Sequence, residues 1–374
     1  MKNFIVVVLS VALVFLFSSC ERTVTGDTEE TPDQSILGCL ACHTDGSGPN
    51  QAVVEQFKYS VHGSGNNTYR NRLYSSRYIS CEQCHTSEGF IAYASGIPAD
   101  GDHFSAFDCF TCHEPHSNGD FRVRITDPVM LENGAVYNRA NSNTCASCHH
   151  SRRDVNEYVY DGVELSSHWG PHHSNQSDML IGENAYEFDG YNYEGSWHET
   201  GVVRGCPSCH MSASVHESIG GHSWNMKNED LDLENITGCN VEGCHYDEPV
   251  ASVDREIDDD YDEDGVEEGI QQEIHDLLDS LGHLLETAGL VDEDHYPIED
   301  RVVTTADSAG ALYNFLFVEE DRSIGVHNTD YAVGLLKSSI NFLITGDPGG
   351  TFVSRDDPGV VMIRKAEPVM LSSH

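Results

Sequence analysis

The stretch Cys145-Ala-Ser-Cys148-His149 places two thiols and an imidazole at a fixed short spacing. The same Cys-x-x-Cys-His pattern occurs at residues 39–43, 81–85, 109–113 and 206–210. Paired cysteines in an exported chain are usually disulfides, but a histidine directly after every pair is typical of covalent c-type haem attachment. Each thiol adds to one vinyl group of the porphyrin, and the histidine then lies beneath the iron. We therefore expect a fold built around haem.

A sixth segment, Cys239-Asn-Val-Glu-Gly-Cys244-His245, carries two extra residues between its cysteines. Haem chemistry fixes only the two sulfur positions and the histidine after the second cysteine, so a bulged loop satisfies it. Gly243 would ease such a bulge. The alternative is a disulfide between Cys239 and Cys244 with an incidental His245. We favour a sixth haem.

Six attachment motifs, as we call these Cys–Cys–His segments, define the expected haem contacts. The predicted thioether residues are Cys39, Cys42, Cys81, Cys84, Cys109, Cys112, Cys145, Cys148, Cys206, Cys209, Cys239 and Cys244. The predicted proximal iron ligands are His43, His85, His113, His149, His210 and His245.

Histidine also dominates the candidates for the opposite face of each iron. The chain has 21 His and only 7 Met, so ligation by two histidines is the economical prediction. It implies low potentials, because methionine as second ligand raises them. Position near the motifs selects His62, His116, His172, His198 and His222 as distal candidates.

The first residues read as an export signal. A basic start, the apolar run from Phe4 to Phe17 and then Ser18-Ser19-Cys20 resemble a bacterial lipoprotein signal. We expect a signal peptide at residues 1–19, lipid on Cys20 and a flexible linker at residues 20–38. An ordinary secretory signal or a short membrane anchor is the alternative, although the run is shorter than the roughly 18 residues of a spanning helix. The expected location is the periplasmic side of a membrane or the cell surface.

Charge and composition limit the partners. With 20 basic against 62 acidic side chains the formal net charge is −42, which argues against nucleic acid and against an anionic membrane surface. Redox partner proteins or an extracellular acceptor are the expected partners. The hydrophobic content is 39%, below the about 45 to 50% typical of globular chains. Porphyrins supplying buried apolar area would explain the deficit.

The expected fold class is mainly α with much irregular structure, and with short helices and loops around stacked haems. We expect a multihaem domain at residues 39–250, an acidic loop with helices at residues 251–345 and an irregular tail at residues 346–374. Apolar spacing predicts a helix over residues 270–285 and two more at residues 309–318 and 331–345. These helices are expected to pack on the haem domain.

Residues 254–268 are strongly acidic and contain Asp260-Tyr-Asp262-Glu-Asp264-Gly265. Alternate carboxylates before a glycine turn suit calcium, and this pattern resembles the start of an EF-hand loop. Its last ligand position carries Gln271 in place of Glu. A calcium site and a solvated acidic linker therefore stay open as alternatives.

Several strings together resemble the multihaem cytochromes c of the superfamily that includes cytochrome c nitrite reductase and hydroxylamine oxidoreductase. They are YSVHGSG at residues 59–65, CFTCHEPH at 109–116, SSHWGPHHSNQSDML at 166–180, CPSCHM at 206–211, GGHSW at 220–224 and GVHNTDYAVGLL at 325–336. The resemblance implies closely stacked haems with iron held by two histidines. It adds His327 as a distal ligand from the carboxy-terminal region.

The chain departs from the enzymes of that superfamily. It has no Cys-x-x-Cys-Lys segment, which nitrite reductases usually carry, and six motifs where the octahaem enzymes need eight. We therefore expect a hexahaem electron carrier and assign no catalytic residue. The alternative is a reductase of nitrite, hydroxylamine or a similar small molecule, with one five-coordinate iron. Assembly into an oligomer or filament is a further expectation that the sequence does not decide.

Overall fold

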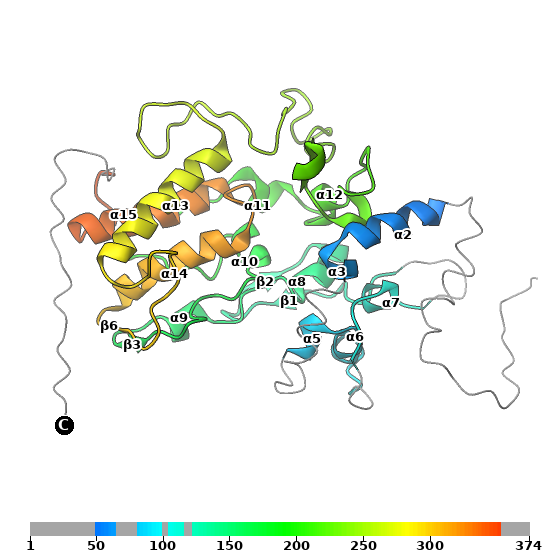
Figure 1. The fold of residues 1–374 in the computed structure, drawn as a ribbon, viewed down its shortest axis with the longest axis horizontal. Helices are drawn as coiled ribbons and strands as arrows, with labels where there is room; N and C mark the ends of the chain where they lie inside the picture. The colour runs from blue at the N-terminus through cyan, green and yellow to red at the C-terminus, as the bar shows by residue number, and fades with distance from the viewer. Residues whose placement is uncertain (1–48, 65–80, 99–103, 116–121, 353–374) are drawn as a thin grey trace, which may run out of the picture.

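A computed structural model describes residues 49–64, 81–98, 104–115 and 122–352. The predicted signal peptide, linker and lipidated Cys20 lie outside the described residues, as do the first attachment motif with Cys39, Cys42 and His43, the candidate ligand His116, and the end of the tail. Within the described residues the chain is mainly helical with long irregular connections, which confirms the expected class (Figure 1).

The described residues between positions 49 and 231 form short helices joined by irregular segments. They are α2 (Pro49–Tyr59), α3 (Val61–Ser64), α5 (Glu82–His85), α6 (Ser87–Ser95), α7 (Cys109–Cys112), α8 (Asn143–Ala146), α9 (Val155–Tyr158), α10 (Gln176–Leu180), α11 (Trp197–Gly201) and α12 (Pro207–His210), with 3-10 turns η1 (Ala140–Ser142), η2 (Gly221–Ser223) and η3 (Glu229–Leu231). Three long helices follow: α13 (Ile270–Thr287), α14 (Ala306–Asp321) and α15 (Thr329–Thr345).

The strands are pairs of two residues each, all antiparallel. They are β1 (Val129–Met130) with β2 (Val136–Tyr137), β3 (Val163–Glu164) with β6 (Val302–Val303), and β4 (Lys227–Asn228) with β5 (Leu233–Glu234). The β3–β6 pair joins the segment after the fourth motif to the connection between α13 and α14.

The three long helices pack on one another and confirm the helices expected from apolar spacing. Helix α13 buries one face, formed by Ile270, Ile274, Leu277, Leu278, Leu281, Leu284 and Leu285. Helix α14 is buried nearly all round, as expected of a helix without a polar face. Its start is fixed by the Thr305 side chain, which accepts a hydrogen bond from the Ser308 amide.

This helical core extends into the preceding part of the chain. One apolar cluster unites the three long helices with Val155, Val163, Leu165, Trp169, Met179 and Phe188. Asn175 Nδ2 also donates to the Phe317 carbonyl over 2.7 Å. The expected packing of the carboxy-terminal helices on the haem-motif region is therefore confirmed.

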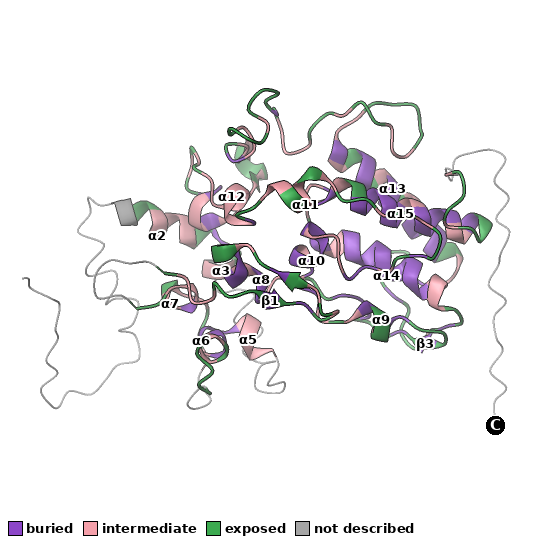
Figure 2. Cartoon of the chain, turned by 180° about the vertical axis from the view of Figure 1, so that it is seen from behind, coloured by how far each residue is buried: buried purple, intermediate pink, exposed green. Residues whose placement is uncertain are grey.

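The opposite end of the molecule has little apolar core of its own. Among the described residues before position 129, Phe90 is the one hydrophobic side chain that is buried. A second small cluster gathers Val129, Leu131, Tyr137, Ala146 and Leu180. Purple buried segments accordingly concentrate on α13, α14 and α15, while α2, α3 and α5 to α7 are largely half-buried or exposed (Figure 2).

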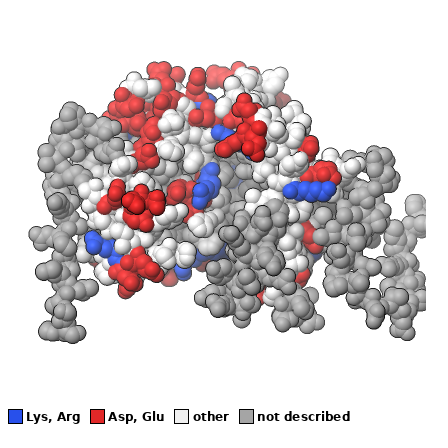
Figure 3. All heavy atoms as spheres, viewed as in Figure 1, with Lys and Arg blue, Asp and Glu red and all other residues white. Residues whose placement is uncertain are grey.

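Carboxylates predominate among the charged side chains, with 62 acidic against 20 basic residues in the chain. Figure 3 shows red acidic side chains spread over the face in view, with few blue basic ones between them. No helix among the described residues has both the length and the apolar character needed to cross a bilayer.

Candidate functional site

Four described attachment motifs share one local structure. Each Cys-x-x-Cys-His segment coils as a single helical turn, in α5, α7, α8 and α12. In each, the histidine amide donates to the carbonyl of the first cysteine, over 3.1 Å at His85, 3.0 Å at His113, 2.9 Å at His149 and 3.0 Å at His210. The two thiols and the imidazole therefore have the same backbone frame at all four places, as expected from the chemistry of attachment.

Local sequence explains why such short turns form. At α7 the Asp108 carboxylate accepts from the amides of Phe110 and Thr111, and Thr111 Oγ1 accepts from the Asp108 amide. This capping box closes the turn from both sides. At α12 Pro207 occupies the first helical position, where its fixed φ suits a helix start.

The segment at residues 239–245 keeps the same closing bond despite its two extra residues. The His245 amide donates to the Cys239 carbonyl over 3.0 Å. The additional length is taken up by a bulge in which Gly243 has φ +85°, as expected from its lack of a side chain. Cys239 and Cys244 are both free thiols. The longer segment therefore presents its sulfurs and imidazole in the manner of the four regular ones.

Each described proximal histidine lies opposite a second histidine. The ring centroids are 6.2 Å apart for His85 and His172, 6.3 Å for His113 and His222, 6.0 Å for His149 and His62, 6.1 Å for His210 and His327, and 6.2 Å for His245 and His198. These five partners are the distal candidates that the sequence selected and that the structure describes. The structure brings them together from segments up to 117 residues apart, as for His210 and His327.

The common separation has a chemical meaning. An imidazole nitrogen bonds a metal ion at about 2 Å, and that nitrogen lies about 1 Å from the ring centre, so two trans imidazoles on one ion have centroids roughly 6 Å apart. All five pairs lie at 6.0 to 6.3 Å. The spacing fits one iron between each pair.

Hydrogen bonds at the other ring nitrogen orient several of these imidazoles. Nδ1 of His210 lies 2.9 Å from the Trp224 carbonyl, and Nδ1 of His198 lies 2.7 Å from the Val326 carbonyl. A carbonyl only accepts, so Nδ1 carries the proton and Nε2 keeps its lone pair. Metal-ligating histidines are held in this way by carbonyl or carboxylate partners.

Two further ligands have side-chain partners. His149 Nδ1 lies 3.0 Å from Gln176 Oε1, and His327 Nδ1 donates to Asp321 Oδ1 over 2.7 Å. Burial acts to lower the pKa of His327, but the buried Asp321 carboxylate outweighs it and raises the pKa. A carboxylate partner makes an imidazole a more basic ligand.

Burial favours the neutral form of three of the distal candidates, His62, His172 and His222. Burial, reinforced by His149, lowers the pKa of His62 to about 4, and burial with His113 lowers that of His222 to about 4. Burial and Arg152 lower the pKa of His172 to about 4. A histidine must be neutral to bind a metal ion, so at neutral pH these rings are ready to do so.

Backbone strain accompanies one of the ligands. His172 has φ +76°, a left-handed conformation that is uncommon for a residue other than glycine. It follows Gly170-Pro171 and turns the ring toward His85. Strain of this kind persists where the surrounding structure imposes it, and it is concentrated at functional sites.

The arrangement does not fit zinc. A four-coordinate zinc ion would need thiolates and imidazoles within a few ångströms of one another. In the described part of the chain, no cysteine belongs to a group of three or more ligand atoms that lie within 4.8 Å of each other. Paired imidazoles with thiols set apart from them fit a wide planar group such as a porphyrin.

The attachment motifs also touch one another. The thiols of Cys84 and Cys148 are in hydrogen-bond contact, and Cys84 Sγ lies 3.9 Å from the Ser147 carbonyl while Cys148 Sγ lies 3.8 Å from the Gln83 carbonyl. These reciprocal contacts pack the motifs at 81–85 and 145–149 directly against each other. The thiol of Cys145 is in turn in contact with that of Cys206.

The motif at 239–245 continues this series. Asn235 Nδ2 donates to the Cys209 carbonyl over 3.3 Å, and a side chain at Gly238 would meet the Ser208 carbonyl at 2.4 Å. The backbone leading into Cys239 is thus packed on the motif at 206–210. Four motifs therefore form a contact series in the order 81–85, 145–149, 206–210 and 239–245.

Trp224 is a site residue that our sequence reasoning did not assign. Its ring lies 5.1 Å from His62 and 5.5 Å from His222, and its carbonyl holds His210. It therefore contacts ligands of three different pairs. The string GGHSW contained the signal, because a tryptophan two residues after a candidate ligand suits packing against it.

Other histidines near the motifs are engaged elsewhere. Nδ1 of the buried His150 lies 2.7 Å from the Ser151 carbonyl and its Nε2 lies 3.0 Å from Arg152 Nη1, so neither nitrogen faces another histidine. His173 is hydrogen-bonded to Glu320, and His168 is exposed. His172 is therefore the member of its cluster that the structure pairs with a proximal histidine.

The acidic loop gathers only part of the expected calcium set. Asp260 and Asp262 lie with Glu273 of α13 in one group of carboxylates. Asp264 is exposed and outside this group, and its Oδ1 accepts from the Val266 amide over 2.7 Å. Gln271 points elsewhere, since its amide bonds Lys227 and the Ser323 carbonyl.

Comparison with known proteins adds no family assignment. No family model, no curated protein and no solved structure matches the chain. The likeness to multihaem cytochromes therefore rests on the motifs quoted above.

Proposed function

We propose that the chain is a hexahaem c-type cytochrome that carries electrons between redox partners outside the cytosol. The observation that supports this most strongly is the set of five histidine pairs, each composed of a motif histidine and a second histidine at 6.0 to 6.3 Å. Covalent haem, when bound there, supplies a one-electron iron couple.

The chain's own residues hold and tune these sites. The thiols would attach the cofactor covalently and the paired imidazoles would bind its iron, while the carbonyl and carboxylate partners at Nδ1 fix ring orientation and ligand basicity. These are the levers by which a protein adjusts a redox cofactor. No acid or base is required for this work.

The contact series of motifs defines the proposed path along which electrons move. Because the thiols of Cys84 and Cys148 touch, and those of Cys145 and Cys206 touch, groups attached through these thiols would be neighbours along the series. The motifs at 145–149 and 206–210 each contact a motif on both sides and are the proposed inner members of the conducting row. The motif at 239–245 is at one end of that row.

The paired histidines favour a carrier over a reductase. A reductase needs an iron with an open position for substrate, and every motif histidine in the described ranges has a partner ring. The motif with His43 lies outside those ranges. The proposal includes attachment by lipid on Cys20, and the strongly acidic surface in Figure 3 suits basic redox partners.

Intact mass and spin state test the function together. We expect the mature protein to carry six haems and its visible and electron paramagnetic spectra to show low-spin iron at low potential. A high-spin fraction that binds nitrite or hydroxylamine would overturn the carrier function in favour of a reductase. A colourless protein, or one with disulfides or zinc at these thiols, would overturn the haem assignment itself.

A further inference from the structure

Helix α13 carries a buried carboxylate that the haem sites do not use. The Glu273 side chain is 1% exposed. One of its oxygens, Oε2, accepts from the amides of Tyr261 and Asp262 over 2.8 and 3.2 Å. The other, Oε1, is buried and has no hydrogen-bond partner. A buried polar atom without a hydrogen-bond partner lowers folding stability by about 1 to 3 kcal/mol. We therefore expect a ligand to bind at this oxygen.

Two further carboxylates converge on the same place. Asp260, Asp262 and Glu273 each offer an oxygen, and these oxygens all lie within 4.8 Å of one another. Oxygens bound to one calcium ion at roughly 2.4 Å lie at most about 4.8 Å apart, so the group has the right size. The charges have no cation to balance them, because none of the ion pairs among the described residues involves these three side chains.

We infer that Asp260, Asp262 and Glu273 form a calcium site that fastens the acidic loop to α13. All the ligand atoms are carboxylate oxygens, which favour a hard cation over zinc or copper. Calcium accepts irregular sets of about six to eight oxygens, completed by carbonyls or water, whereas magnesium demands near-ideal octahedral geometry. The sequence of the loop pointed to Asp264 and position 271, but the closing ligand comes from Glu273, two residues further along.

The proposed calcium site lies on the segment that connects the last attachment motif to α13. The loop begins just after His245 and ends at α13, whose Gln271 amide donates to Asp254 Oδ1 over 2.8 Å. A cation joining loop and helix would fix the segment that follows the last attachment motif. This role concerns stability and holds whether or not the proposed electron transfer is correct.

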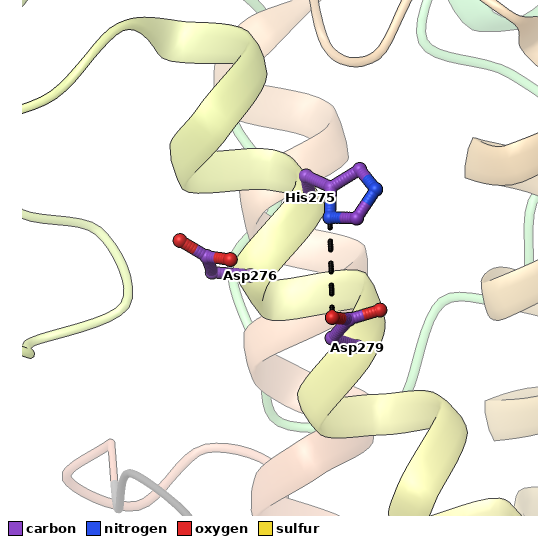
Figure 4. Close-up of side chains that lie close together, drawn as sticks. All are labelled: His275, Asp276 and Asp279. Atoms are coloured by element: carbon purple, nitrogen blue, oxygen red, sulfur yellow. Dashed lines mark ion pairs between the residues drawn. The ribbon is translucent and has the colours of Figure 1, made fainter.

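A second acidic cluster on the same helix provides a contrast. His275, Asp276 and Asp279 lie on the outer side of α13, with one contact between His275 and Asp279 at 4.0 Å (Figure 4). The side chains of His275 and Asp279 are about 60% exposed, at 60% and 58%. Water satisfies such groups, so we assign no ion to this cluster and use it as the control.

The inference is tested by titrating calcium into the haem-loaded protein in a calorimeter, after a chelator has removed any bound calcium. We expect one saturable calcium site with affinity in the micromolar to millimolar range and a rise in melting temperature on adding calcium. Glu273→Gln keeps the size of the side chain and should weaken calcium binding at least tenfold. Asp279→Asn, the matched control, should bind calcium as the parent does.

The sign of the change in melting temperature distinguishes loss of the calcium site from unspecific destabilisation by the substitution. Without calcium, Glu273→Gln should melt at the same temperature as the parent or higher, because it removes a buried, uncompensated charge. It should then fail to gain stability when calcium is added. Absence of saturable calcium binding to the parent, equal weakening by Asp279→Asn, or equal affinity for magnesium would overturn the inference.

Discussion

At the scale of single residues, ligand histidines depend on neighbours that are not ligands. Gln176, Asp321 and the carbonyls of Val326 and Trp224 each hold an Nδ1. Sequence patterns predicted the motif histidines as iron ligands, because attachment chemistry would fix their position after the second cysteine. They did not identify these partners, because the hydrogen bonds follow no fixed spacing and join positions between 6 and 128 residues apart.

Substitution of Trp224 should disturb two haem sites without removing any haem. Trp224→Leu withdraws the ring that packs on His62 and His222. We expect a partial change from low-spin to high-spin iron at the motifs 109–113 and 145–149, with the intact mass still showing all haems. Tyr160→Leu, an exposed aromatic position, serves as control. Identical spectra for both variants would contradict the role of Trp224.

The buried Asp178 should give stability a pH dependence. Burial raises its pKa from 3.8 to about 7. Because the folded-state pKa is raised, the stabilisation from this group is complete below about pH 4 and is lost as pH rises through about 7. Asp178→Asn should flatten the melting temperature between pH 5 and 8. It should also lower stability by about 1 to 3 kcal/mol, because the amide accepts less well from the Ser151 and Asn184 donors. An unchanged slope in the variant would refute this assignment.

At the scale of elements, two kinds of helix coexist for different reasons. The long helices were predictable from apolar spacing, and Ile274, Leu277 and Leu281 are buried as that spacing required. The helical turns of the attachment motifs, in α5, α7, α8 and α12, were predictable from attachment chemistry instead. The partnership of Glu273 with the acidic loop was not predictable, because its position fits no regular calcium pattern.

The bulged motif should hold a haem of its own. Replacing both Cys239 and Cys244 by Ser removes its two thiols, so the intact mass should fall by one haem while the other sites keep theirs. Val241→Ala, within the same loop, is the control and should retain the full number. Loss of no haem in the double variant would show that this segment is not an attachment site.

A cavity in the helical core should lower stability but not cofactor content. Leu281 is fully buried in α13, and Leu281→Ala should cost about 2 to 5 kcal/mol. Leu231→Ala, at a position 50% exposed, should change stability by less than about 0.5 kcal/mol. Urea denaturation followed by far-ultraviolet circular dichroism measures both. Equal effects of the two variants would contradict the assigned core.

At the scale of the whole molecule, the apolar core and the attachment motifs are unevenly distributed. The core lies with α13 to α15, while the end with α2, α3 and α5 to α7 has few buried hydrophobic residues (Figure 2). Composition predicted this deficit, since 39% hydrophobic residues are few for the length. The sequence did not predict which motifs contact one another, because those contacts depend on how loops without a periodic pattern fold.

The overall charge should govern reaction with small redox probes. With a formal charge of −42, a cationic complex such as hexaammineruthenium should react faster at low salt than anionic ferrocyanide or ferricyanide. Allowing for driving force, we expect the cation's rate constant to fall at least tenfold between about 10 mM and 500 mM salt, and the anion's to rise. Stopped-flow absorbance measures both. Rates independent of salt would show that the negative field does not reach the electron-entry sites.

The contact between Cys84 and Cys148 has a consequence for biogenesis. Each belongs to a different motif, and their contact lowers the pKa of Cys84 to about 7, so that much of it is thiolate at neutral pH. A thiolate beside a second thiol in an oxidising compartment is prone to crosslinking. On the proposed function, maturation would have to attach the porphyrins before the polypeptide folds, or keep its thiols reduced until attachment is complete.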